Sequence, residues 1–309
     1  MGTAMVAGFW RSHARASRRA WAYWFIAPTT LAIFLIFCYP LGVALWSSLH
    51  FDVMIRPTLY RFIGLGNYTA VLGEPRFWAA LQTTAIFFLA TVGATMLLGL
   101  IVALRLNRDF GRWNWIKPLF LIPMVVTPIV VGIQWKFMLN SQMGVITHFA
   151  RVLGLPVSAW LTESRGAMFW VIAVDVWYFT PIVILLFSAG LAAIPGEVLE
   201  AARVDGASEW QTLWHVTLPM LKSIAVTALL IRTIGGLRTF DTILVLTDGG
   251  PGRVTEVVNL FAYRLGFYYF DMGKASALGW VMLVVAVILV LIYIYLLKAT
   301  AESSTAVAR

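Results

Sequence analysis

The chain has 309 residues, of which 61% are hydrophobic and only 12% are charged. A soluble domain carries about 25% charged residues, so this composition excludes an ordinary water-soluble enzyme or binding domain. The net charge of +9 is not evidence for a nucleic-acid partner, because the basic residues are scattered or lie in short connectors instead of along one helix face. The composition predicts an integral membrane protein surrounded by the lipid bilayer.

Six segments are long and apolar enough to cross a bilayer core, which takes about 20 helical residues. They are Ala22–Leu49, Ala80–Leu104, Ile116–Leu139, Ala167–Ala193, Ser223–Leu246 and Ala275–Leu297. The first segment follows a basic run, as in a signal peptide, but it is much longer than a signal h-region of roughly 7 to 15 residues. We therefore expect it to be retained. The predicted fold is all-α, a polytopic transmembrane helix bundle of about six spans.

Basic residues give the expected orientation, because cytoplasmic loops near helix ends are enriched in Lys and Arg. The strongest bias lies before the first span and after the second, in Arg11, Arg15, Arg18, Arg19, Arg105, Arg108, Arg112 and Lys117. We therefore expect both termini in the cytoplasm. Residues 1–21 would form an N-terminal tail, residues 22–298 the transmembrane domain, and residues 299–309 a C-terminal tail.

The connector between the fourth and fifth spans, residues 194–222, is too polar to cross a membrane, and by parity it faces the cytoplasm. Val198, Leu199, Ala201 and Ala202 fit a short amphipathic helix, which Gly206 would end. Ser208 stands three residues before Gln211, the spacing of a capping box at the start of a second helix. The sequence therefore predicts two short helices joined by a glycine turn beneath the bundle.

The connector also carries a longer pattern: Glu200-Ala201-Ala202, three residues, Gly206, nine residues, Val216, one residue, Leu218-Pro219. This pattern resembles the cytoplasmic EAA motif of binding-protein-dependent ABC importer permeases, with Val216 where isoleucine is usual. In that family the first short helix docks into a cleft on an ATPase subunit. The resemblance implies an ATPase-coupling site at Glu200, Ala201, Ala202, Asp205, Gly206, Ala207, Leu218 and Pro219.

Two alanines would allow close approach to a partner, Glu200 would offer an anion to a basic surface, and Gly206 would supply the bend. The alternative is an amphipathic helix that only anchors the connector at the lipid surface. Such helices favour basic residues that face anionic lipid, whereas this connector carries four acidic and two basic residues. We therefore favour docking.

A second resemblance concerns the substrate. Phe240-Asp241, Leu246-Thr247 and Gly249-Gly250-Pro251 look like the end of the fifth span in the carbohydrate branch of these permeases, which includes maltose, trehalose and glycerol-phosphate systems. Trp24 to Pro28 (WFIAP), Tyr39-Pro40 and Gly64 to Tyr68 (GLGNY) are similar to that branch as well. The likeness covers nearly the whole chain and implies a sugar or sugar derivative as substrate.

The same resemblance implies the partners and the location. A second related permease, two ATP-binding cassette ATPase subunits and an extracytoplasmic substrate-binding protein are expected, in a bacterial plasma membrane. The chain contains no G-x-x-x-x-G-K-[ST] loop to hold phosphates. We therefore expect ATP and Mg on the ATPase subunits and no cofactor bound by this chain.

Charged residues inside a span usually face a bundle interior, a partner or water. Asp175 is followed by two aromatic residues and by Pro181, which leaves a backbone carbonyl in the preceding turn without its helical donor. Pro123 and Pro128 interrupt the third span near a glutamine and a tryptophan. We therefore predict a substrate pathway lined by Gln134, Trp135, Asp175, Trp177, Tyr178, Arg232, Arg238 and Asp241.

Structural roles are the alternatives for several of these residues. Arg238 and Asp241 are three residues apart, so on one helix face they would neutralise each other. Trp177 and Tyr178 would pack between helices, as aromatic residues in bundles usually do.

Other functional classes fit less well. The four histidines, His13, His50, His148 and His215, show no ligand spacing, so no metal site is predicted. No nucleophile stands beside a base, and the paired carboxylates of a membrane-embedded glycosyltransferase are not found, so we do not expect an enzyme. The alternative transporter is one driven by an ion gradient, a class often marked by internal repeats, and no repeat is visible here.

Overall fold

Helices dominate this computed structural model, which describes residues 23–107, 111–154 and 160–307. Four helices are long and apolar enough to cross a membrane: Tyr23–Ser48, which includes η1 (Phe34–Cys38) and α2 (Tyr39–Ser48), α4 (Pro75–Leu106), α7 (Ser164–Ala192), and the part Met272–Leu296 of α14 (Met272–Val307). Each overlaps a predicted span. The prediction of an all-α membrane bundle is confirmed, whereas the predicted tail 1–21 lies outside the described residues.

The predicted third span is broken. The end of η3 (Gly111–Val125) and α5 (Pro128–Met138) meet at 102°. Thr127 is extended, with ψ 144°, because the ring of a following proline disfavours the α conformation. The prediction that prolines interrupt this span is confirmed.

The predicted fifth span is wrong in its C-terminal part. It ends as α11 (Lys222–Arg238) and resumes as the short α12 (Asp241–Thr247), with Thr239 and Phe240 outside both helices. At its other end α11 meets the helix Glu209–Met220 at 63°. If this bent pair and the broken third span each count as one, the structure has up to six spans.

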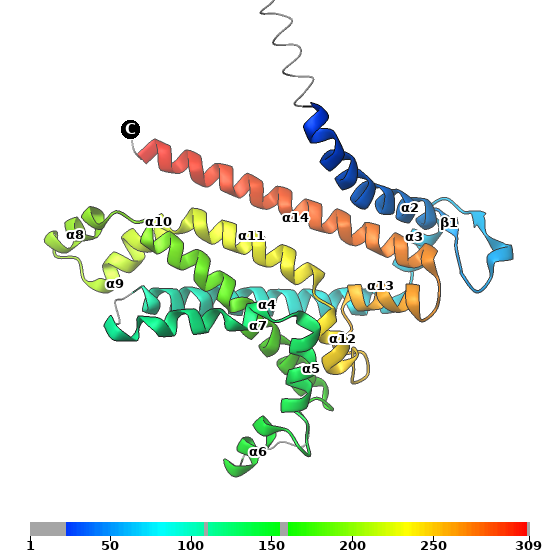
Figure 1. The fold of residues 1–309 in the computed structure, drawn as a ribbon, viewed down its shortest axis with the longest axis horizontal. Helices are drawn as coiled ribbons and strands as arrows, with labels where there is room; N and C mark the ends of the chain where they lie inside the picture. The colour runs from blue at the N-terminus through cyan, green and yellow to red at the C-terminus, as the bar shows by residue number, and fades with distance from the viewer. Residues whose placement is uncertain (1–22, 108–110, 155–159, 308–309) are drawn as a thin grey trace, which may run out of the picture.

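Short elements lie at both ends of the bundle (Figure 1). One end carries α8 (Gly196–Val204), α9 (Glu209–Thr212), η4 (Leu213–Thr217) and α10 (Leu218–Met220). The opposite end carries β1 (His50–Phe51), η2 (Pro57–Leu59), β2 (Arg61–Phe62), α3 (Gly66–Leu72) and α13 (Val258–Phe267). The helix α6 (Val145–Val152) projects away from the bundle beyond α5 (Figure 1).

The first and last spans are joined at the end that carries β1. The amide nitrogen of Asn67 donates to the backbone carbonyls of Ser48 (2.8 Å) and His50 (2.7 Å). A side chain at Gly273, the second residue of α14, would lie 2.6 Å from the His50 carbonyl. Only glycine allows this close approach.

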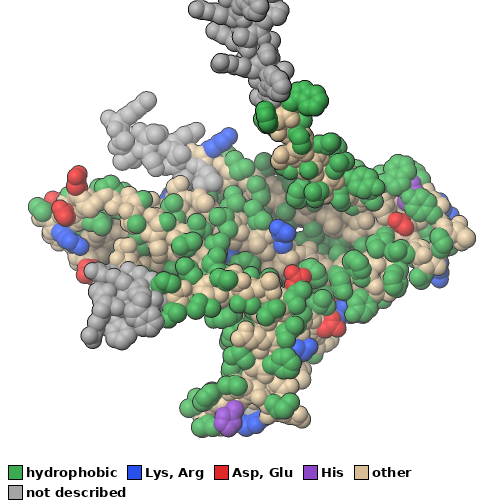
Figure 2. Space-filling model, viewed as in Figure 1, with side chains coloured by type: hydrophobic (Ala, Val, Ile, Leu, Met, Phe, Trp, Pro, Cys, Tyr) green, Lys and Arg blue, Asp and Glu red, His purple; other side chains and the backbone are tan. Residues whose placement is uncertain are grey.

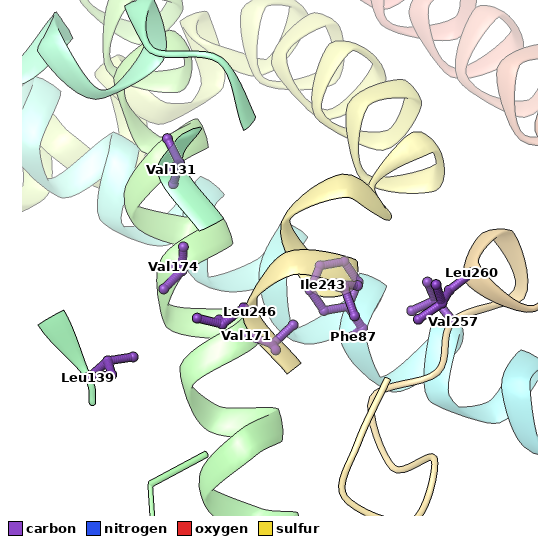
Figure 3. Close-up of a cluster of buried hydrophobic side chains, with 9 residues drawn as sticks. All are labelled: Phe87, Val131, Leu139, Val171, Val174, Ile243, Leu246, Val257 and Leu260. Carbon is purple, nitrogen blue, oxygen red and sulfur yellow. The ribbon is translucent and has the colours of Figure 1, made fainter. Parts of the chain in front are cut away.

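Three clusters of buried apolar side chains hold the helices together. The first joins α4, α5, α7, α12 and α13 and is drawn in Figure 3: Phe87, Val131, Leu139, Val171, Val174, Ile243, Leu246, Val257 and Leu260. The second packs α3, α4, α13 and α14, and the third packs α4 against α7 and α11. In the third cluster Gly99 lies so close to α7 that a Cβ there would stand 2.5 Å from Val183.

Many large apolar side chains are exposed on the helices, as contact with lipid requires. Figure 2 shows hydrophobic side chains spread over one face, with charged side chains at the ends and a few near the middle. In the most apolar stretch of the first helix, no residue is buried. Its side chains are thus available to lipid or to another membrane helix.

Candidate functional site

The two broken spans meet each other inside the bundle. Thr242 in α12 donates its hydroxyl to the Pro128 carbonyl at the start of α5 (3.3 Å). Lys136, near the other end of α5, donates Nζ to the Val245 carbonyl (2.9 Å), which satisfies an orphan carbonyl of the last turn of α12. Gly132 between them would place a Cβ 3.2 Å from Val245. The helices α5 and α12 are therefore packed as a pair.

A pocket of about 240 Å³ lies where this pair meets α7 and α11. Its lining is Pro128, Tyr178, Phe179, Gly235, Arg238, Thr239, Asp241 and Thr242. The pocket thus brings together three predicted pathway residues from three helices, namely Tyr178, Arg238 and Asp241. It combines hydroxyl, guanidinium and carboxylate groups with aromatic faces, a mixture suited to a polar ring compound.

The expectation that Arg238 and Asp241 share a helix face is wrong. The break at Thr239 and Phe240 separates them into two helices, and within the described ranges neither residue makes an ion pair. Arg238 is exposed and also lines a second cavity, about 430 Å³, between α2, α11 and α14, where the surface in Figure 2 is hollowed.

Two other predicted pathway residues do form an ion pair, which joins Asp175 on α7 to Arg232 on α11. Both are buried, with 3% and 0% of their surface exposed. Thr95 on α4 accepts a hydrogen bond from Nε of Arg232 (3.4 Å), and Thr239 donates to the other carboxylate oxygen (3.5 Å). The Phe179 ring covers the guanidinium, 4.3 Å from its Cζ. The two predicted pathway charges thus neutralise each other behind the pocket wall.

Three other predicted pathway residues, Gln134, Trp135 and Trp177, do not line this pocket. Trp135 and Trp177 pack edge to face, with ring centroids 5.4 Å apart, and Trp135 also contacts Trp170 at 6.1 Å. Trp177 lines a third cavity, about 610 Å³, beside Pro123, and Gln134 is exposed on α5. The structure brings neither tryptophan nor Gln134 into the lining of the smaller pocket.

The connector, residues 194–222, forms the predicted pair of short helices joined by a glycine turn, and we call this segment the elbow. α8 ends in a glycine turn, with Gly206 at φ 80° and the Ala207 N–H bonded to the Ala202 carbonyl (3.0 Å). Ser208 and Gln211 form a reciprocal capping box at the start of α9. The predicted glycine turn and the predicted capping box are both confirmed.

The surface of the elbow is open. Glu200, Ala201 and Asp205 are exposed, and Val204 has 87% of its surface exposed. Beside the turn is a cavity of about 300 Å³ lined by Asp205, Gly206, Ala207, Gln211, Thr212, His215 and Val216. Leu218 and Pro219 lie just before the 63° bend into α11, so the elbow continues into a membrane helix.

The sequence does not predict one cluster of charged side chains around Glu256. Glu256, with 2% of its surface exposed, accepts hydrogen bonds from Arg76 (2.9 and 2.7 Å) and Arg264 (2.6 Å). Burial acts to raise the pKa of Glu256, but the two guanidinium groups outweigh it and hold the pKa below its ordinary value. Arg76 and Glu256 are 180 residues apart, and the sequence contains no local pattern that pairs them.

Residues 95–302 match the model of the family described as binding-protein-dependent transport system inner membrane component. This chain belongs to that family. The match covers more than half of the chain and includes α7, the elbow, α11 and α12. Membership confirms the resemblance seen in the EAA pattern and makes the protein a multi-pass membrane permease component. Among the described residues, no group of three or more His, Cys, Asp or Glu is arranged to hold a metal ion.

Curated relatives of this permease are similar over most of their length. The trehalose/maltose transport system permease protein MalF of Thermococcus litoralis is 37% identical over 85% of this chain and 90% of its own. The trehalose transport system permease protein SugA of Mycobacterium tuberculosis is 35% identical over 88% of this chain and 87% of its own length.

The fold of this permease is also found in a solved structure. A chain of a bacterial alginate ABC transporter, in complex with an alginate pentasaccharide-bound periplasmic protein, has a TM-score of 0.78 and 22% identity. The superposition covers 90% of this chain and 94% of that chain.

Proposed function

We propose that this permease forms, with a second related permease, the membrane pathway of an ATP-driven importer for a sugar or sugar derivative. The observation that carries the proposal is the pocket at the break between α11 and α12, where Tyr178, Arg238 and Asp241 converge. The pocket combines polar and apolar groups at the junction of two broken spans. Irregular backbone within a membrane is tolerated where it is buried or lines a cavity.

The chemistry of this pocket suits a sugar. A sugar ring presents hydroxyl groups around its edge and C–H groups on its faces. Arg238 and Asp241 supply a donor and an acceptor without an ion-pair partner among the described residues, and Tyr178 with Phe179 supplies aromatic faces. Asp175 and Arg232 support the pocket from behind through Thr239. The trehalose/maltose and trehalose transport system permeases to which this chain is similar favour the same class of solute.

The elbow is proposed as the ATPase-coupling site, through Glu200, Ala201, Ala202, Asp205, Gly206, Ala207, Leu218 and Pro219. Its support is the exposed helix α8 next to a capped turn and its short connection to α11. A displacement of α8 is therefore transmitted to α11, the helix that carries Arg232 and Arg238. In this proposal ATP and Mg bind to two separate ATPase subunits, and the elbow and both termini face the cytoplasm.

The proposed cycle is alternating access. Closure of an ATPase dimer moves the elbow, and the bundle opens outward to accept a solute from an extracytoplasmic binding protein. The solved alginate transporter is in complex with such a periplasmic protein. The same cycle here is an expectation from the family and the elbow geometry.

Reconstitution tests the proposal. The permease is placed in proteoliposomes with candidate permease, ATPase and binding-protein partners, and ATP hydrolysis is measured with trehalose or maltose. We expect hydrolysis that depends on sugar and binding protein. Glu200→Arg should abolish the sugar dependence, whereas Glu197→Arg, the same charge change one turn earlier in α8, should retain most of it. Uptake driven by an ion gradient without ATPase subunits would support the secondary transporter instead.

A further inference from the structure

Both halves of the broken fifth span are attached to α4 by polar contacts. The inner half, α11, is attached near its middle, where Arg232 donates to Thr95. The outer half is attached at the start of α4, where Arg76 holds Glu256 in the segment that follows α12. The pocket lies at the break between these two attachments. The helix α4 is therefore the frame that sets the separation of α11 and α12.

The outer attachment is a tight network around one carboxylate. Arg76 forms two parallel hydrogen bonds to Glu256, a geometry that gives both strength and direction. Arg264 on α13 donates to the same carboxylate and, through its other terminal nitrogen, to the backbone carbonyl of Asp248 (2.6 Å). Asp248 is the residue that ends α12. The end of α12 is thus linked through Arg264 and Glu256 to α4.

The surroundings of this network restrict its movement. The Arg76 guanidinium lies over the Phe261 ring, 4.7 Å from the centroid, and donates to the Tyr269 hydroxyl (3.1 Å). The Thr255 hydroxyl, next to Glu256, donates to the Gly250 carbonyl (2.9 Å) and contacts the Thr247 hydroxyl (2.8 Å). The segment between α12 and α13 is therefore held together by its own hydrogen bonds, and it moves as one unit with the end of α12.

We infer that Glu256 is a positioning residue for the solute pocket, an inference that rests on the proposed function of that pocket. The helix α12 has seven residues, so the pocket residue Asp241 stands about 10 Å along the helix axis from Asp248. A displacement at one end of so short a helix reaches the other end undiminished. Without the Glu256 carboxylate, α12 moves relative to α11, the pocket opens, and solute binding weakens. Glu256 itself does not touch solute.

The first test measures access to the pocket without any transport. The single cysteine, Cys38, is replaced by serine, and Thr242→Cys places a thiol in the pocket lining. The labelling rate by a membrane-impermeant methanethiosulfonate reagent is then measured in the assembled transporter. We expect Glu256→Gln to raise this rate at least fivefold. The matched control is Lys274→Gln, which removes the ion pair with Asp271 (3.3 Å). That ion pair involves neither Glu256 nor α12, so this variant should leave the rate unchanged.

The second test separates positioning from a general structural role. Uptake of radiolabelled trehalose is measured over a range of concentrations. Glu256→Gln should raise the half-saturating concentration at least fivefold with a maximal rate within twofold of wild type, and Glu256→Asp, which keeps a carboxylate, should recover part of the loss. A reduced maximal rate at unchanged half-saturation, or an unchanged labelling rate, would overturn the inference. If the wild-type transporter moves neither trehalose nor maltose, these two sugars are excluded as its solutes, and the labelling result still decides the role of Glu256.

Discussion

The buried pair Asp175–Arg232 gives a quantitative prediction. Removing one partner of a buried ion pair costs about 3–5 kcal/mol, because the other charge is left without compensation. In Asp175→Ala, Arg232 would keep only the 3.4 Å hydrogen bond to Thr95 and the face of Phe179. Its Nη1 has no hydrogen-bond partner among the described residues of the native structure either. Since arginine cannot lose its proton in a protein, we expect a loss of stability in the upper part of that range.

The reverse substitution should be less damaging. In Arg232→Met, the Asp175 carboxyl can take up a proton and become neutral, and Thr239 still bonds to it. We therefore expect a loss of about 1–3 kcal/mol, the usual cost of an incompletely satisfied buried polar group. The double variant Asp175→Leu with Arg232→Met removes both charges. It should lie within about 1 kcal/mol of wild type, because apolar replacements of buried pairs are often neutral.

The assay is equilibrium unfolding of the purified permease in mixed micelles, with the two single variants and the double variant compared at one pH. The order of stability should be wild type and double variant, then Arg232→Met, then Asp175→Ala. If Asp175→Ala loses less than about 1 kcal/mol, or if the losses of the two single variants simply add in the double variant, the two charges are not coupled in the way that the structure indicates.

Three further predictions follow from single positions. Gly99→Ala should destabilise the α4–α7 packing by about 1–3 kcal/mol, because its Cβ would stand 2.5 Å from Val183, whereas Gly93→Ala on the same helix meets open space and should be neutral in thermal unfolding. Gly206→Val should lower sugar-dependent ATP hydrolysis at least tenfold, since φ 80° disfavours a branched side chain, while Gly196→Ala at the start of α8 should not. The lowered pKa of Glu256 means that its pairing stabilises the fold above its ordinary pKa of 4.5 and loses this contribution as the pH falls through the lower folded value. Acid titrations of stability should therefore show the difference between wild type and Glu256→Gln shrinking below about pH 4.5; a constant difference would contradict this.

The features that the sequence predicts well are those governed by local rules. Lipid demands long apolar helices, so four spans are found close to their expected places. The glycine turn at Gly206 and the capping box at Ser208 depend only on neighbouring residues, and both form as predicted. Pro128 likewise breaks the third span through its own geometry.

The features that the sequence does not predict depend on packing between distant segments. Hydropathy falls at Arg238 and Asp241, on either side of Thr239 and Phe240. Charges three residues apart are also compatible with a continuous helix, so this dip does not by itself show that α11 ends there. The rule for charges three residues apart pairs Arg238 with Asp241, whereas Arg232 finds its partner 57 residues away on another helix. Glu256 and Arg76 meet across 180 residues. Such contacts follow from the arrangement of the helices and not from any spacing along the chain.

The junction between the first and last spans has a consequence for biogenesis. Gly273 closes against His50 only after more than two hundred intervening residues have left the ribosome. At roughly 5–20 residues per second of translation, the leading helix waits on the order of ten seconds or longer before its final neighbour arrives. During that interval it depends on lipid or on the insertion machinery to shield it, so ribosomal pausing between the two segments should increase its exposure to membrane proteases.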